Sequence, residues 1–284
     1  VKADSMDNYR WTPLSYAAEL GHEAVVKLLM ARKDVEADSK DNNYGRTPLS
    51  YAAERGHKAV VKLLVACNDV KADSKDNYKR TPLTRAAERG HEAVVKLLLT
   101  RNHLETDSKD NNYGRTPLSY AAEGGHKAVV KLLLARNDVE ANSKDRCFGQ
   151  TPLSYAAAGG HEAAAVKLLL ARNDVEADSK DRYFGRTPLS CAAEGGHEAV
   201  VKLLVARKDV EADSGDNDGR TPLSKAAEGG HEGVVKLLVA RNDVEADSRN
   251  KDGRTPLSYA VEGGHEAVVK LLLAEDGVNP DSKD

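Results

Sequence analysis

The stretch TPLSYAAEGGHKAVVKLLLA, residues 116–135, decides the fold of this chain, because close copies of it occur eight times in 284 residues. A unit that repeats at such a period cannot bury its apolar face alone and does so by stacking on its neighbours. The sequence therefore predicts a solenoid, which has a long surface and no closed pocket for chemistry. The Thr-Pro-Leu starts lie 34 to 36 residues apart, at Thr12, Thr47, Thr81, Thr116, Thr151, Thr187, Thr221 and Thr255.

Each repeat predicts a helix, a tight turn, a second helix and a polar finger. In the second repeat Thr47 is a good N-cap, and Pro48 follows at the first helical position, where its missing N–H costs nothing. Leu49 and the alanines three and four residues after it form one apolar stripe. The segment 68–79 is rich in Asp, Asn, Ser and Lys, so we expect it to project as a turn or β-hairpin finger.

The repeats run through the chain without a break in composition, which predicts one array over residues 1–284. Residues 1–5, VKADS, match the spacer that elsewhere follows a repeat, so we expect an excerpt of a longer protein. The repeats are expected at approximately residues 9–43, 44–77, 78–112, 113–147, 148–183, 184–217, 218–251 and 252–284.

The fifth repeat carries one residue more than the others between its His and its second-helix leucines. The extra residue lies in the segment HEAAAV, residues 161–166. An insertion of this kind either bulges the helix or is absorbed in the turn before it. Three alanines ease absorption, so we favour a shift at the start of the helix.

Composition excludes several classes of function. The 42 basic and 45 acidic residues leave a net charge of −3, which argues against general nucleic-acid binding. The apolar runs are too short for a membrane span. The three cysteines, Cys67, Cys147 and Cys191, fall at different positions of the repeat and form no disulfide framework. We therefore expect an intracellular protein, cytoplasmic or nuclear.

Eight histidines, one per repeat, are the first candidates for a metal site. Equivalent residues of successive repeats lie roughly 8–10 Å apart, whereas zinc takes its nitrogen ligands at about 2.1 Å. We therefore expect each histidine to bond to the backbone in a turn. Since no phosphate loop, Cys-x-x-Cys pair or serine elbow occurs either, the sequence predicts no enzyme, no cofactor and no metal. The histidines are His22, His57, His91, His126, His161, His197, His231 and His265.

The segment RTPLSYAAEGGHKAVVKLLLA, residues 115–135, resembles the ankyrin repeat, whose hallmarks are a Thr-Pro-Leu-His start, a Gly-His turn and a Val-Val-x-Leu-Leu second helix. The resemblance covers the whole chain and implies an all-α solenoid of eight helix-turn-helix repeats with β-hairpin fingers. In the near identity of its copies, the chain is also similar to the ankyrin arrays of large fungal nucleotide-binding proteins. The signature His is replaced by Thr84 or by Ser15, Ser50, Ser119, Ser154, Ser190, Ser224 and Ser258.

The resemblance implies a non-catalytic module that binds a protein or peptide on the concave face, between the fingers and the first helices. An alternative is a regulatory or sensor arm of a larger nucleotide-binding or enzyme protein, which would contact its own chain. A third possibility is an elastic spacer with no partner.

The positions that vary between repeats are the candidates for partner binding. They are the residue before each Thr, the position two after each Leu, the end of the first helix and the finger aromatics. Tyr, Trp and Arg often dominate binding energy at interfaces. Alternatively, these side chains shield neighbouring repeats and pair with the glutamates of the first helices. The candidates are Trp11, Tyr16, Tyr44, Arg46, Tyr51, Arg55, Lys79, Arg80, Arg85, Arg89, Arg115, Tyr120 and Tyr155.

Six basic residues gather in the second and third repeats, against only Glu54 and Glu88 nearby. Arginines beside tyrosines can bind carboxylates or phosphates bidentately, so an acidic or phosphorylated peptide is expected to dock there. Arg85 and Arg89 are expected to be surface residues. In the alternative interpretation the arginines pair with local acids and are solvated.

Overall fold

The structure is a computed structural model that describes residues 3–101, 103–160, 163–275 and 278. Its secondary structure is helical: the described residues contain helices and turns but no strand. The chain divides into two compact units, Val1–Arg146 and Cys147–Asp284. The prediction of an all-α fold built from helix-turn-helix repeats is confirmed.

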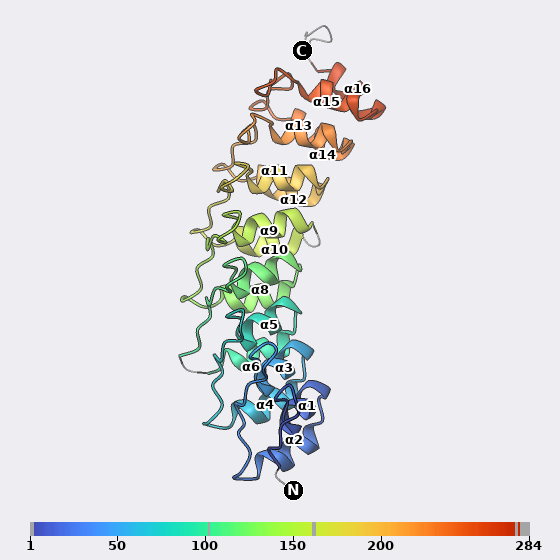
Figure 1. The fold of residues 1–284 in the computed structure, drawn as a ribbon. Helices are drawn as coiled ribbons and strands as arrows, with labels where there is room; N and C mark the ends of the chain where they lie inside the picture. The colour runs from blue at the N-terminus through green and yellow to red at the C-terminus, as the bar shows by residue number, and fades with distance from the viewer. Residues whose placement is uncertain (1–2, 102, 161–162, 276–277, 279–284) are drawn as a thin grey trace. The chain divides into compact units, whose positions relative to one another are not determined.

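The first unit stacks four helix pairs in chain order (Figure 1). Each first helix packs on the first helix of the next repeat, and each second helix packs on the next second helix. The helices are α1 (Pro13–Leu20), α2 (Glu23–Met30), α3 (Pro48–Arg55), α4 (Lys58–Val65), α5 (Pro82–Glu88), α6 (Glu92–Leu98), α7 (Pro117–Glu123) and α8 (Lys127–Leu134).

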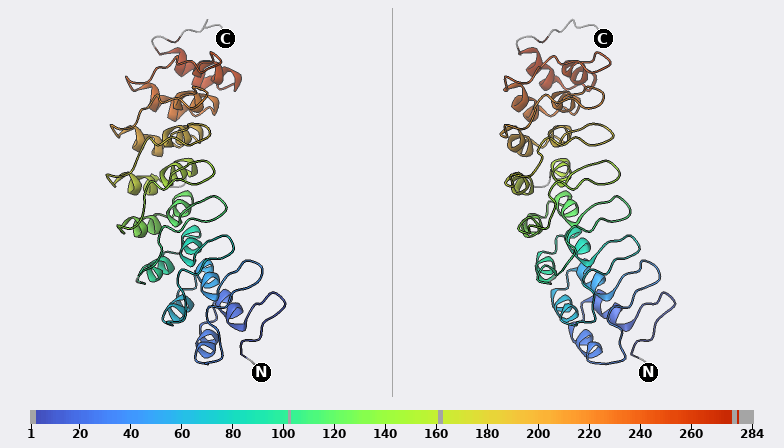
Figure 2. Two further views of the ribbon diagram at one scale, coloured as in Figure 1. Left: turned by 60° about the vertical axis from the view of Figure 1, so that its left-hand side comes forward. Right: turned by 90° about the vertical axis from the view of Figure 1, so that its left-hand side faces the viewer.

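The second unit repeats this arrangement, and Figure 2 shows the finger loops of each unit on one side of its helix pairs. Its helices are α9 (Pro152–Gly159), α10 (Ala163–Leu170), α11 (Pro188–Glu194), α12 (Glu198–Val205), α13 (Pro222–Glu228), α14 (Glu232–Val239), α15 (Pro256–Glu262) and α16 (Glu266–Leu273).

The first helices begin at the residues that the sequence indicates. Thr47 lies in extended backbone, and its hydroxyl oxygen accepts the Ser50 N–H at 3.2 Å, with Pro48 at the first helical position of α3. The Ser50 and Thr47 hydroxyls are 3.1 Å apart. The serine that replaces the signature histidine thus completes a buried helix cap inside its own repeat.

Six of the histidines each link their repeat to the one before it. Gly56 has a φ of 76°, and the ring of His91 from the next repeat lies against it. His91 Nε2 is 2.9 Å from the carbonyl oxygen of Glu54, near the end of α3. The prediction of backbone-bonded histidines is confirmed for six of them: His57, His91, His126, His197, His231 and His265. His161 lies outside the described residues.

The fingers are loops rather than two-stranded hairpins, so the β-hairpin part of the prediction is wrong for the described residues. The Asp41 N–H donates to the Arg46 carbonyl at 3.1 Å, and no ladder extends from this bond. A ladder is prevented because the Asp41 carboxylate takes the N–H groups of Tyr44 and Arg46, at 2.7 and 2.8 Å. Adjacent fingers are joined instead, as where the Asn42 N–H donates to the Tyr9 carbonyl at 2.9 Å.

The extra residue of the fifth repeat does not bulge its second helix. Helix α10 is a regular α-helix of eight residues, as long as α2 or α12. It begins two residues after the histidine position instead of one. The insertion therefore precedes α10, in the segment that holds positions 161–162, which lie outside the described residues.

Candidate functional site

In four repeats a tyrosine two positions after the leucine of the first helix anchors the finger that precedes this helix. Tyr51 is only 3% exposed, and its hydroxyl donates to the Asp41 carboxylate at 2.9 Å. Burial first, and then this bond, raise the pKa of Tyr51. Equivalent contacts join Tyr16 to Asp7 at 2.8 Å, Tyr120 to Asp110 at 2.9 Å and Tyr259 to Asn250 at 3.0 Å.

Other residue types at this position make the same contact where they are long enough. The Arg85 guanidinium donates to Asp76, and the Lys225 ammonium lies 3.3 Å from Asp216. Cys191 is too short for this reach, and burial raises the pKa of its thiol to about 11. Where the residue two positions after the leucine is Tyr, Arg or Lys, its side chain therefore holds the finger that precedes its helix through a polar contact.

Arginines before the helix caps pair with the glutamates of the first helices, as the alternative interpretation holds. Arg46 Nη1 lies 2.8 Å from Glu54, and its guanidinium stacks on the Tyr44 ring, 4.8 Å from the centroid. Arg80 and Arg115 pair with the glutamates of α5 and α7 in the same way. Arg80 also donates to the Tyr120 hydroxyl at 2.8 Å.

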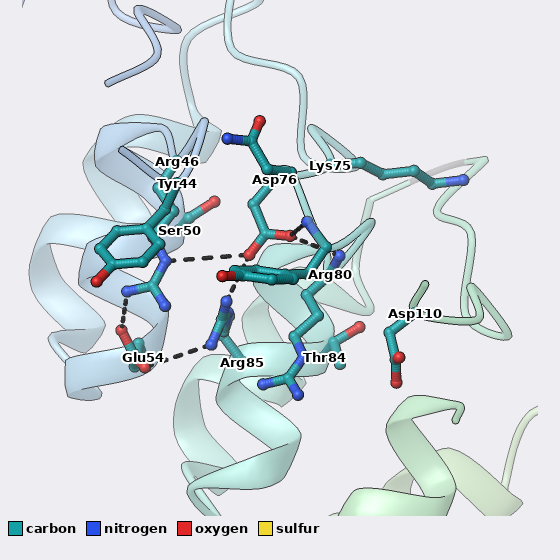
Figure 3. A network of polar contacts seen from close by, with 12 residues as sticks. Tyr44, Arg46, Ser50, Glu54, Lys75, Asp76, Arg80, Thr84, Arg85 and Asp110 are labelled. Atoms are coloured by element: carbon teal, nitrogen blue, oxygen red, sulfur yellow. Dashed lines mark hydrogen bonds and ion pairs between the residues drawn. The ribbon is translucent and has the colours of Figure 1, made fainter. Parts of the chain in front are cut away.

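Arg85 is the centre of a charged network (Figure 3). Its guanidinium contacts Asp76 and lies 3.6 Å from Glu54, while Arg46 reaches the same Asp76 at 3.9 Å. Arg85 is 5% exposed and Asp76 is buried as well. The expectation that Arg85 is a surface residue is therefore wrong.

The sequence analysis counted only Glu54 and Glu88 as nearby acids and missed Asp76, which contacts both Arg85 and Arg46. The signal was present in the Ser-Lys-Asp sequence that recurs in five fingers, since Asp76 belongs to a column with Asp41 and Asp110. The column was missed because the aspartate lies nine residues before Arg85 in the chain, and only the fold of the finger brings the two together. The excess of positive charge in these repeats is smaller than the sequence indicates.

The remaining candidates differ in exposure. Tyr16, Tyr44, Arg55, Lys79 and Arg89 are exposed. Trp11, Arg46, Arg80 and Tyr155 are half-buried, and Tyr51, Arg85, Arg115 and Tyr120 are buried.

An open pocket of about 460 Å³ lies over the network in the second and third repeats. Its two exposed cations are Arg55 and Arg89, whose side chains are 58% and 59% exposed. Arg55 pairs with Glu19 at 2.9 Å, and Arg89 lies 3.9 Å from Glu54. Arg46, Glu54 and His91 line the rest. The two guanidinium groups are exposed although Glu19 and Glu54 are largely covered, so the arginines can exchange partners at little cost, because an ion pair of a solvated side chain contributes only about 0–1 kcal/mol.

A second set of equivalent aspartates lies three residues before the finger aspartates, as Asp107 lies before Asp110. Asp107 is half-buried, and burial raises its pKa. One carboxylate oxygen accepts the Glu140 N–H at 2.6 Å, whereas Oδ1 has no hydrogen-bond partner. Asp38, Asp73, Asp178 and Asp213 have pKa values raised by the same cause. The fourth repeat has Asn142 at this position.

We expect Asp107→Asn to stabilise the chain at pH 7 by up to about 1 kcal/mol, a small value because the carboxylate is partly solvated. A raised folded-state pKa means that the folded state binds the proton more tightly, so the stabilising contribution of protonation is lost as the pH rises through that pKa. The variant's advantage should therefore shrink as the pH falls towards 4. Urea unfolding of the wild type and the variant at pH 7 and at pH 4 measures the difference in the free energy of unfolding. An equal advantage at both would rule out the burial of charge as its cause.

The described part of the chain shows neither a cluster of metal ligands nor a membrane-spanning helix. No three His, Cys, Asp or Glu side chains group there in a way that could hold a metal ion. No helix of that part is long and apolar enough to cross a membrane.

The comparisons with known proteins agree with the fold. The family model described as ankyrin repeats (three copies) matches residues 1–76, 67–145, 134–216 and 201–284. A search of the curated proteins found no match to this chain.

Proposed function

Because the chain belongs to the ankyrin repeat family, whose members are generally protein–protein interaction modules, we propose that it binds a protein or peptide partner without catalysis of its own. The binding surface is the concave face, which the first helices and the fingers form. An arm that contacts another segment of its own protein would use the same surface.

The observation that carries this proposal is the set of exposed side chains on the finger–helix face of the first three repeats. Tyr16 and Leu20 are exposed on α1, and Arg55 and Arg89 are exposed at the ends of α3 and α5. The finger aromatic Tyr44 is exposed beside them. Exposed aromatic and arginine side chains on one face are typical of binding hot spots.

The charges of this face favour an acidic or phosphorylated peptide over the second and third repeats. Arg85 is committed to Asp76 and cannot serve such a peptide. Arg55 and Arg89 are exposed, and each contacts a single glutamate, Glu19 and Glu54, so a partner carboxylate or phosphate can take the place of these acids. We therefore place the anchor of such a peptide at Arg55 and Arg89.

We expect the double variant Arg55→Glu with Arg89→Glu to weaken binding of such peptides at least tenfold, which corresponds to about 1.4 kcal/mol. The measurement is fluorescence anisotropy with a pool of labelled phosphoserine and glutamate-rich peptides. Its stability should change little because both side chains are exposed.

A matched control makes the same charge change on the other side of the same repeats. Lys62 and Lys96 are exposed on the second helices α4 and α6. Their double change to Glu should leave peptide affinity within about twofold. Equal loss in both double variants would indicate a general charge effect and would remove the proposed anchor.

A further inference from the structure

Most repeats close the turn after the second helix with an ion pair between Arg and the Asp two residues later. Arg136 Nε and Nη2 donate to Asp138 at 2.8 Å each. The guanidinium also reaches the Leu99 carbonyl at the end of the preceding second helix, at 3.5 Å. The same pair joins Arg32 to Asp34, Arg172 to Asp174, Arg207 to Asp209 and Arg241 to Asp243.

The third repeat breaks this pair and leaves its arginine available. It keeps Arg101, but His103 stands where six of the other seven repeats have Asp. In the described residues 3–101 and 103–160, Arg101 has no carboxylate within 4.0 Å, whereas its counterparts each hold one. The planar guanidinium fork that elsewhere binds a carboxylate is therefore unoccupied by the protein's own acids.

A second departure from the repeat adds positive charge at the same place. Lys71 occupies the position of a glutamate that recurs in the other described repeats. Lys71, Arg101 and His103 line one pocket of about 400 Å³, together with Asp73 and Leu104. The equivalent glutamates are Glu36, Glu105, Glu140, Glu176, Glu211 and Glu245.

The acid in this pocket, Asp73, holds a backbone N–H with one carboxylate oxygen. Asp73 Oδ1 accepts the Glu105 N–H at 3.1 Å, and burial raises the pKa of this carboxyl group. Its neighbours Lys75 and Glu105 pair with each other at 2.7 Å, so they balance in charge. The donors that remain for a ligand are the ammonium of Lys71, the guanidinium of Arg101 and the imidazole of His103.

The backbone conformation of His103 is also unusual for a residue with a side chain. Its φ is 64°, in the left-handed region that residues with a side chain seldom adopt. The other two described non-glycine residues with positive φ, Arg10 and Lys79, lie in fingers. Such strain is concentrated at ligand sites, where surrounding contacts maintain it.

We propose that the pocket formed by Lys71, Arg101 and His103 binds a phosphate group. The phosphate takes the place of the carboxylate that Asp supplies to the arginine in five other repeats, and its oxygens accept bidentate hydrogen bonds from Arg101. Three donors of positive or polar character favour a dianion over a single carboxylate. This site lies after the second helix and is independent of the peptide surface at Arg55 and Arg89.

The test is an NMR titration of the ¹⁵N-labelled chain with inorganic phosphate at pH 7.5, with sodium chloride added to a reference sample at matched ionic strength. We expect saturable shifts of the amides at 71–73 and 103–105 with phosphate and not with chloride. Acetate, a planar monoanion, should bind at least tenfold more weakly. Equal shifts with chloride, or acetate binding as tightly as phosphate, would overturn the proposal.

The variant His103→Asp is a sharp test because it restores the ion pair that five other repeats possess. It should fold at least as stably as the wild type and should bind phosphate at least tenfold more weakly, since the introduced carboxylate fills the guanidinium fork. The matched control is Asn137→Asp, which adds the same charge to the equivalent turn of the fourth repeat and should change affinity less than twofold. Unchanged affinity in His103→Asp, or an equal loss in Asn137→Asp, would show that no specific site exists.

Discussion

Replacement of Arg85 by Glu is expected to lower the free energy of unfolding by about 3–5 kcal/mol, because it leaves Asp76 buried without its partner and adds a second buried carboxylate beside it. Arg85 is 5% exposed and contacts both Asp76 and Glu54. Urea unfolding followed by circular dichroism measures the loss. Protease digestion should also cut the finger at residues 76–80 faster in the variant, since Asp76 and Arg85 hold that loop on α5.

The matched control is Arg89→Glu, four residues later on the same face. Its side chain is 59% exposed and its contact with Glu54 is long, at 3.9 Å. This change should cost less than about 1 kcal/mol. Equal losses for the two variants would mean that the Asp76 network does not stabilise the fold.

Replacement of Gly230 by Ala is expected to cost about 2–4 kcal/mol, from the strain of a positive φ and from overpacking. Gly230 has a φ of 69°, and a Cβ there would lie 2.5 Å from Nδ1 of His265. The imidazole cannot withdraw without losing its contact with the Glu228 carbonyl, which is 2.9 Å from Nε2. Thermal and urea unfolding of the variant measure the cost.

Gly264 offers a control in the same kind of turn. Its φ is 68°, but a Cβ there would meet no atom within 4 Å. Gly264→Ala should therefore show the backbone strain alone, about 1–2 kcal/mol. If the two variants lose the same stability, the packing of the next histidine against the glycine contributes nothing to the stacking of repeats.

The local features of each repeat could be predicted because they depend on residues close in the chain. Thr47 and Pro48 start α3, the alanines after Leu49 face the core, and His91 bonds to a backbone carbonyl, all as the sequence indicates. The insertion in the fifth repeat likewise leaves α10 regular. The period of the repeat then determines that each unit stacks on its neighbour, because the same apolar stripe recurs every 34 to 36 residues.

The candidate site could be predicted only in part, since exposure of a helix face depends on what folds over it. The position of Tyr51 and Arg85 on α3 and α5 is opposite the leucine stripe, which predicts an exposed side chain. In the structure the finger lies above this face, and its aspartate takes the tyrosine hydroxyl or the guanidinium. Arg55 and Arg89, one turn further along, lie beyond the finger and stay exposed.

The sequence alone thus determined the repeat, its two helices, their caps and the backbone-bonded histidines, because each follows from hydrogen bonds and apolar contacts within or between successive copies. Only the tertiary structure decided which charged and aromatic residues support the fold and which face solvent. The physical reason is that a finger aspartate must find donors for its lone pairs when it is buried. Whether Tyr51, Arg85 or Lys225 supplies the donor depends on the path of the loop rather than on the pattern of the helix.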